Sequence, residues 1–293
     1  MAEANIGSHA SQDHHGEGAA AIHPAMRLFE PFVKERAIDL TAFIGQWPSR
    51  LQIRADAASL SAMADRWELS AMCVSHIASI FGFDTRSGNE ELFRETAGDA
   101  RLLPFPIIDP SEFGWEHELA WAAAKGARGI RLVPGYHGYS LMSPQVASLI
   151  DRVRELSLPL HVCVRLEDER LTHPRFPAAV VPFDEIGECL RLCEDMPVII
   201  SGLRAREWGS VYEVLNAGHR TDRVLLDLWF TNGPIEAIAS VCRSGMASRL
   251  GYGSNTPIQV AEATSLQLAS AAITAEERSA LCRGNAAALL GLE

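Results

Sequence analysis

The chain has 293 residues, a length that a single α/β barrel domain commonly fills. Hydrophobic residues make up 47% of it and charged residues 22%, so there is enough apolar material for a core and a disordered chain is excluded. Its 26 Lys and Arg stand against 37 Asp and Glu, a formal charge of −11, which argues against general binding to nucleic acid or to an anionic membrane. Any small anionic partner must therefore be held by a few local arginines.

In chain order, residues 1–24 come first and are rich in Ala, Gly, Ser and His without an apolar period. This composition is typical of a flexible tail, whose histidines are expected to bind metal only adventitiously. Residues 25–293 are predicted to form one domain. No run reaches the roughly 20 apolar residues of a membrane span and no secretory signal is visible, so we expect a cytoplasmic protein. The six cysteines form no CxxC pair, which is typical of reduced thiols in a core.

From residue 37 onward, short apolar runs alternate with longer segments of helical period, a pattern that predicts β-α units and a parallel sheet. Eight strands are expected, at 37–44, 70–76, 102–108, 129–133, 158–164, 198–200, 223–228 and 249–253. Helices are expected at 57–67, 112–125, 144–155, 183–194, 207–216, 234–243 and 258–268, and a last one begins after Thr274 with a capping-box sequence. Eight such units predict a (β/α)8 TIM barrel. No GxGxxG or GxxxxGK[ST] follows a strand, which disfavours nucleotide binding of those kinds.

Five motifs, in order along the chain, resemble the amidohydrolase-related family. They are residues 38–48 at the end of the first strand, 126–132 with 136–139, 158–162 with 165–170, Gly-Ser-Asn-Thr-Pro at 253–257, and the terminal 284–292. Together they span about residues 37–292. The resemblance implies a barrel whose active site lies where the carboxyl ends of the strands meet the following loops.

This chain departs from the family at its metal site. At the positions where the family has ligands, the chain carries Thr41, Phe43, Cys163, Ser201 or Gly202, and Asn255. The resemblance thus implies a divergent member without the metal-ligand histidines. A catalytic divalent site needs about three His, Asp, Glu or Cys ligands, so we expect no metal and no other cofactor. An unfamiliar ligand set of His137, His161 and Cys163 is the alternative.

The residues left on the expected active face are cationic and polar. The candidate acids or bases are His137 and Asp227, and the candidate substrate-binding residues are Arg131, Tyr136, Tyr139, His161, Arg165, Arg204 and Asn255. Arginine pairs bidentately with carboxylates, and a histidine in a Gly-bracketed loop can move a proton near neutral pH. Trp229 and Phe230 raise the pKa of Asp227 if they bury it.

Structural interpretations stand beside these functional ones. Arg165 and Arg170 can instead form a solvated salt-bridged loop with Glu167, Asp168 and Glu169. His137 can cap a neighbouring carbonyl, Asp39 is expected to hydrogen-bond within its own turn, and Asp109 before Pro110 is expected to begin a turn. Cys163 is expected to be a buried small residue.

Two functions of different class follow. The first is a metal-independent hydrolase, lyase or isomerase that acts on a small carboxylate or lactone, with Arg131 and Arg165 as anion clamps and His137 or Asp227 moving the proton. The alternative is a catalytically inactive barrel that serves as a binding or partner subunit. Pairing through outer helices, as a homodimer or with a partner enzyme, is compatible with either function.

Overall fold

The computed structural model describes residues 24–48, 53–175, 177–216, 222–231 and 236–293. Eight parallel strands form its centre: β1 (Ile38–Gln46), β3 (Ala71–His76), β4 (Leu102–Pro104), β5 (Ile130–Leu132), β6 (Leu160–Cys163), β7 (Val198–Ser201), β8 (Val224–Asp227) and β9 (Leu250–Gly251). They pair as β1-β3-β4 and as β5-β6-β7-β8-β9, and a short β2 (Arg54–Ala55) adds an antiparallel edge to β1. Parallel bridges from Ile107 to Arg131 and from Ala42 to Thr256 join the two sheets into a closed barrel. The predicted (β/α)8 fold is confirmed.

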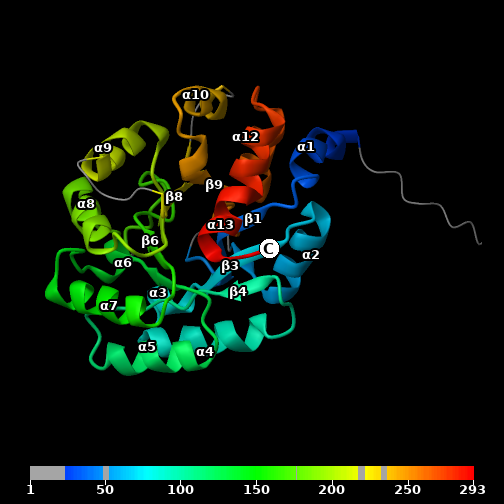
Figure 1. Ribbon diagram of the computed structural model, residues 1–293. Coiled ribbons are helices and arrows are strands. Elements are labelled where there is room, and N and C mark those ends of the chain that lie inside the picture. The colour runs from blue at the N-terminus through cyan, green and yellow to red at the C-terminus, as the bar shows by residue number, and fades with distance from the viewer. Residues whose placement is uncertain (1–23, 49–52, 176, 217–221, 232–235) are drawn as a thin grey trace, which may run out of the picture.

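Helices follow one another around these strands (Figure 1). They are α1 (Glu30–Val33), α2 (Ala57–Trp67), α3 (Ala78–Phe81), α4 (Thr85–Thr96), α5 (Trp115–Ala124), α6 (Pro134–His137), α7 (Pro144–Glu155), α8 (Phe183–Leu192), α9 (Ala205–Asn216), α10 (Ala237–Arg243), α11 (Ala261–Ser270), α12 (Ala275–Ser279) and α13 (Asn285–Leu290), with short turns η1 (Pro24–Phe29), η2 (Ala247–Arg249) and η3 (Ala280–Gly284). The helices predicted at 57–67 and 144–155 are confirmed to the residue. The tail predicted at 1–24 lies outside the described residues except for Pro24, which begins η1.

The sequence prediction misses α4 because its buried face is small and polar. Thr85, Gly88, Asn89, Leu92 and Thr96 point inward at helical spacing, yet only one of them is strongly apolar. A Cβ on Gly88 would lie 2.3 Å from the Ser79 hydroxyl, so the close contact of α3 with α4 requires glycine. Asn89 fixes the register because its amide group exchanges two hydrogen bonds with the backbone of Ile107. Apolar periodicity alone does not reveal such a helix.

The two ends of the barrel are filled differently. At the amino-terminal ends of the strands, α13 lies across the barrel, in front of the strands in Figure 1, and covers the apolar side chains of Ile38, Leu40, Phe105 and Leu225. At the carboxyl ends lies a second apolar group, here called the mouth cluster, which consists of Phe43, Trp47, Ile77, Ile80, Ile107, Val133, Cys163 and Leu166. Side chains therefore fill the barrel, as in other small barrels.

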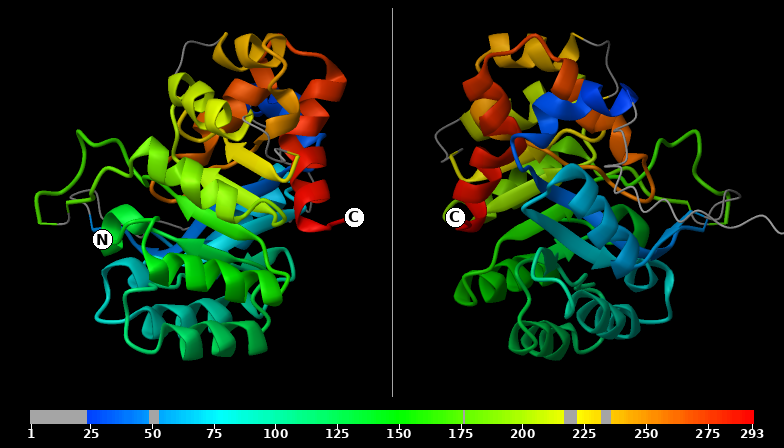
Figure 2. Two further views of the ribbon diagram at one scale, coloured as in Figure 1. Left: turned by 60° about the vertical axis from the view of Figure 1, so that its left-hand side comes forward. Right: turned by 90° about the vertical axis from the view of Figure 1, so that its right-hand side faces the viewer.

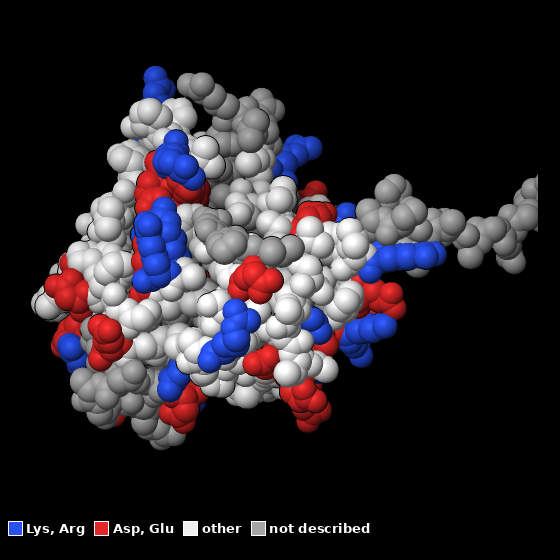
Figure 3. Space-filling view, turned by 90° about the horizontal axis from the view of Figure 1, so that it is seen from above, with Lys and Arg blue, Asp and Glu red and all other residues white. Residues whose placement is uncertain are grey.

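The loop from β6 to α8 projects from the barrel end opposite the C-terminus (Figure 2, left). It belongs to the carboxyl ends of the strands, where barrel enzymes carry their active sites. Seen from above, basic and acidic side chains lie next to each other, and neither sign forms a continuous area on that face (Figure 3). Among the described residues, no helix has the length and apolarity that crossing a membrane requires.

Candidate active site

The strongest candidate centre is the carboxyl group of Asp227 at the end of β8. Its Oδ2 atom accepts hydrogen bonds from the hydroxyls of Thr41 and, at 2.5 Å, of Ser201. Trp229 donates from Nε1 to the Ser201 hydroxyl at 2.9 Å, and the two hydroxyls are 3.3 Å apart. Only 1% of Asp227 is exposed, and this burial raises the pKa of its carboxyl to about 7 although the hydroxyls oppose the shift. The carboxyl can therefore hold or release a proton near neutral pH.

Two glycines make room for this centre. Gly202 follows β7 with φ +84°, and a Cβ there would come within 2.3 Å of the Arg165 carbonyl oxygen. Its N–H points to Asp227 Oδ1 at 3.4 Å, and its carbonyl accepts from Arg165 at 2.7 Å. Gly253 lies against the carboxyl, since a Cβ there would be 2.9 Å from Asp227 Oδ2. The chain thus brings β7, β8 and β9 together around one acid.

A second buried carboxyl, Asp39 on β1, ties β1 to the segment after β9. Its Oδ1 accepts from the backbone N–H groups of Thr41 at 3.0 Å and Ser254 at 2.9 Å, and its Oδ2 accepts from the Ser254 hydroxyl. Burial raises its pKa to about 6 against the effect of these bonds. This arrangement agrees with the structural role predicted for Asp39.

Arg131 lies inside the barrel and not at its mouth. Its guanidinium donates to the carbonyls of Ala42 and Cys73 at 3.0 Å and of Leu40 at 3.3 Å, and it contacts His161 Nδ1 at 3.3 Å. Both side chains are fully buried. Burial and the adjacent guanidinium lower the pKa of His161, whose Nε2 has no partner among the described residues. The prediction placed both residues where a substrate binds, whereas in this structure they join β1, β3, β5 and β6.

Arg165 and Arg204 are at the mouth, but each is paired with acids. Arg165 contacts Glu207 at 2.8 Å and Glu169 at 3.6 Å, and Arg204 pairs with the same two glutamates. Both guanidinium groups also lie over the ring of Phe230, at 5.6 and 4.8 Å. The four charges sum to zero, so these arginines are not free cations in this state. The exposed side chain of Arg170 pairs with Asp168, as its structural interpretation predicts.

His137 ends α6 and contacts α3 and the turn at Asp109 instead of joining the Asp227 centre. Its Nε2 is 3.1 Å from the Ser79 carbonyl and its Nδ1 is 3.5 Å from Asp109. Burial lowers its pKa, and Asp109 partly opposes that shift. Asp109 accepts from the Ser111 N–H at 2.8 Å, which is the turn expected there. Tyr139 lies beside the His137 ring.

Tyr136 packs against the mouth cluster, Cys163 belongs to it, and Asn255 bonds to its member Leu166. The Tyr136 ring contacts Trp47 at 5.9 Å, and burial raises the pKa of its hydroxyl. Asn255, with φ +53°, donates from Nδ2 to the Leu166 carbonyl at 2.8 Å, and its buried Oδ1 has no partner among the described residues. Burial raises the pKa of the Cys163 thiol to about 12, so it is a thiol at neutral pH and a poor nucleophile.

Several side chains at the positions where the resemblance places metal ligands already have protein partners. Within the part of the chain that the structure describes, no three His, Cys, Asp or Glu side chains group as metal ligands, so His137, His161 and Cys163 do not form the alternative set. The Thr41 and Ser201 hydroxyls are directed to Asp227 instead. The sequence points to Asp227 and shows Thr41 and Ser201 only as replacements for metal ligands. That these hydroxyls meet at Asp227 depends on strands far apart in the chain.

Comparison with known proteins gives a family and a set of similar folds. The family described as Amidohydrolase matches residues 89–292 of this chain. No curated protein matches this chain. A probable 2-pyrone-4,6-dicarboxylic acid hydrolase from Acinetobacter baumannii, solved with citric acid bound, has a TM-score of 0.63 and 13% identity over 88% of this chain and 100% of that one.

Two decarboxylases have the same fold. The 2,6-dihydroxybenzoate decarboxylase from Rhizobium has a TM-score of 0.63 and 15% identity, over 87% of this chain and 98% of that one. The 5-carboxyvanillate decarboxylase from Sphingomonas paucimobilis has a TM-score of 0.63 and 11% identity, over 88% and 99%. At these identities the likeness concerns the barrel itself.

Proposed function

The chain belongs to the Amidohydrolase family, and on that premise we propose that it is an enzyme acting on a small carboxylate or lactone without a divalent metal, with Asp227 as its acid and base. The observation that carries the proposal is the buried Asp227 carboxyl, whose pKa is raised to about 7 at the carboxyl end of a barrel strand. The three similar structures are named as enzymes whose substrates are small carboxylates, which supports this substrate class.

Metal independence is supported by the chemistry of the side chains at the family's ligand positions. Thr41 and Ser201 are neutral hydroxyls already bonded to Asp227, and Phe43 offers no lone pair. Cys163 stays a thiol, and a metal would need the thiolate. Asn255 directs its amide N–H to a carbonyl. These residues do not fit a divalent cation, so no step of the reaction is assigned to one.

In the proposed reaction, ionised Asp227 takes a proton from water or from the substrate, and the protonated form returns it to the leaving group. A pKa near the working pH keeps both forms populated, which is what general acid–base catalysis requires. Thr41 and Ser201 keep the carboxyl oriented in either form, because a hydroxyl can donate or accept. The unpartnered Asn255 Oδ1 is available to accept a hydrogen bond from the substrate.

Arg165 and Arg204 are the proposed carboxylate-binding residues. Glu207 is nearly buried beneath them, whereas about half of the Glu169 side chain is exposed. A substrate carboxylate can therefore displace Glu169 and take over its place between the two guanidinium groups. The backbone of Gly202 connects Arg165 to Asp227 through its carbonyl and its N–H, so a substrate held there lies close to the acid.

The test is turnover of a panel of small carboxylates and lactones, measured with and without a chelator. We expect chelator-resistant turnover that falls about 100-fold or more in Asp227→Asn, the usual contribution of an acid–base group. Glu169→Gln, which weakens the competing ion pairs, is expected to lower KM. Activity that appears only with added zinc or manganese would overturn metal independence.

One observation favours the second function, a barrel that binds without catalysis. The mouth cluster covers the strand ends with buried apolar side chains, and Arg131 uses its donors on backbone carbonyls. A partner subunit does not need an accessible substrate pocket at the carboxyl ends of the strands. This function predicts no turnover for any member of the panel and no effect of Asp227→Asn on the assembly of a complex.

A further inference from the structure

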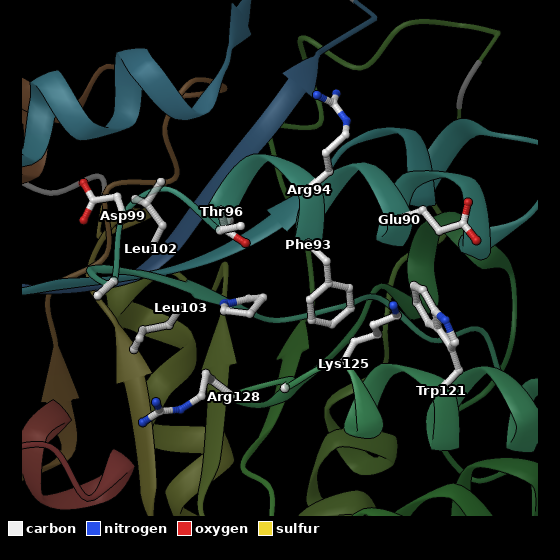
Figure 4. A pocket seen from close by; sticks show the side chains of 14 residues that line it. Glu90, Phe93, Arg94, Thr96, Asp99, Leu102, Leu103, Trp121, Lys125 and Arg128 are labelled. Atoms are coloured by element: carbon white, nitrogen blue, oxygen red, sulfur yellow. The ribbon is translucent and has the colours of Figure 1, made fainter.

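A pocket of about 710 Å3 lies at the barrel end opposite Asp227, at the amino-terminal ends of β4 and β5 (Figure 4). Its walls come from α4, from β4 with the turn before it, and from the end of α5 with the residues leading into β5. Its volume is in the range of small-molecule sites. Leu102, Leu103 and Pro104 give it an apolar side.

Two cations in this pocket lack partners. Among the described residues, no hydrogen bond or ion pair involves the side-chain nitrogens of Lys125 or Arg128, and both residues are exposed. The other charged groups of the wall are already paired: Asp99 with Arg101 at 2.7 Å, Glu90 with Arg86 at 3.7 Å, and Arg94 with Glu91. Among the described residues, Lys125 and Arg128 are therefore the cations of this wall without an ion-pair partner, whereas Arg86 also pairs with Glu118 at 2.5 Å and Arg101 also pairs with Asp65.

Two aromatic side chains complete the wall. Phe93 of α4 and Trp121 of α5 meet edge to face with ring centroids 5.5 Å apart, and both are half-buried. The Arg86 guanidinium lies 3.9 Å from the centre of the Trp121 ring and holds it in place. Figure 4 shows Lys125 beside these two rings and Arg128 toward Leu103.

We propose that this pocket is a second ligand site, distinct from the Asp227 centre, and that it binds a planar aromatic dicarboxylate. The two free cations match two carboxylates, and the rings of Phe93 and Trp121 match a flat apolar body. The acids Glu90 and Asp99 in the same wall disfavour a polyphosphate, which would bring several negative charges close to them.

The test uses isophthalate (benzene-1,3-dicarboxylate) as the probe and calorimetry as the measurement. We expect saturable binding that weakens about tenfold or more in the double variant Lys125→Ala/Arg128→Ala. A matched control, Lys34→Ala/Arg152→Ala, removes two exposed cations that are paired with Glu30 and Glu155, and is expected to bind as the parent does. Asp227→Asn is also expected to bind normally, which separates this site from the proposed active site.

Three results would overturn the proposal. They are the absence of saturable isophthalate binding at millimolar concentration, equal weakening in the two double variants, and loss of binding in Asp227→Asn alone. Binding of inorganic phosphate tests whether the aromatic rings contribute. If phosphate binds as tightly as isophthalate, the rings contribute nothing and the pocket is a simple anion site. None of these results depends on whether turnover is found.

Discussion

Two buried carboxyls, Asp39 and Asp227, are both contacted by Thr41, yet they are held in different ways. Asp39 accepts from two backbone N–H groups, those of Thr41 and Ser254, with one hydroxyl in addition. The close partners of Asp227 are two hydroxyls, and the single backbone N–H, that of Gly202, is at 3.4 Å. Burial raises both pKa values, to about 6 and about 7 respectively.

The difference indicates which acid is built to change its protonation state. The two backbone N–H groups that bind Asp39 both donate to its Oδ1 and can only donate, so this oxygen must remain an acceptor whatever the pH. A hydroxyl can turn from donor to acceptor, so Thr41 and Ser201 can follow a proton on or off Asp227. Asp39 therefore serves the fold, because it joins β1 to the segment after β9, and the hydroxyl partners of Asp227 support its proposed role as the acid and base.

The largest expected effect is on stability and comes from Asp39→Ala. This change leaves two buried backbone N–H groups without an acceptor, at about 1–3 kcal/mol each, so we expect the free energy of unfolding to fall by about 3–5 kcal/mol. Asp227→Ala is the matched control. There the two released hydroxyls lie 3.3 Å apart and can bond to each other, so the loss is expected to be smaller. Urea unfolding at pH 8 measures both, and equal losses would remove the distinction between the two acids.

The next effect concerns Asp227→Asn and its dependence on pH. The folded pKa of Asp227 lies above its unfolded value, so folding takes up a proton between about pH 4 and 7, and ionisation of the buried group costs stability above that window. Each pKa unit between the folded and unfolded values of Asp227 corresponds to about 1.4 kcal/mol of stability. The neutral amide avoids this cost, so the variant is expected to be more stable than the parent at pH 8, by an amount that shrinks as the pH falls toward 4.

Measuring the difference between variant and parent matters here, because other groups titrate in the same window. Burial lowers the pKa of His137 and His161, and such neutral buried histidines make stability rise with pH, which is the opposite sign. These contributions cancel when the unfolding free energy of the parent is subtracted from that of the variant at each pH. If Asp227→Asn is destabilised by the same amount at every pH, the carboxyl is a structural acceptor like Asp39.

The sequence predicts the barrel well because its signals are local and repeated. Eight apolar runs separated by helical segments suffice for the (β/α)8 fold, and the Pro144–Glu155 helix has its Ser143 cap in the sequence itself. Sequence-based prediction fails for α4, whose inward face includes Gly88 and Asn89. Those residues are recognisable only once Ser79 and the Ile107 backbone lie beside them.

Prediction of the site is limited by which way a side chain points. From its apolar neighbours Trp229 and Phe230 we expect a raised pKa for Asp227 if they bury it, and the structure buries the carboxyl and raises its pKa. For Arg131, the residue type suggests an anion clamp, but the strand directs it inward to three carbonyls. Likewise Arg165 and Arg204 meet Glu207 only through the loop geometry after β6 and β7. Inward or outward direction at a strand end depends on the barrel's register, which the residues of a single strand end do not show without the neighbouring strands.

The smallest effects come from removing one hydroxyl at each carboxyl, and they sharpen the comparison most. The Ser201 hydrogen bond lowers the pKa of Asp227, so Ser201→Ala raises it further, and the acid limb of the kcat/KM profile is expected to move up by up to about one pH unit. Ser254→Ala removes the corresponding hydroxyl from Asp39 and is expected to cost about 1 kcal/mol of stability without moving the profile. Because Asp39 keeps its two backbone donors in that variant, a shifted profile in Ser254→Ala, or an unshifted one in Ser201→Ala, would mean that the reaction does not depend on the protonation of Asp227.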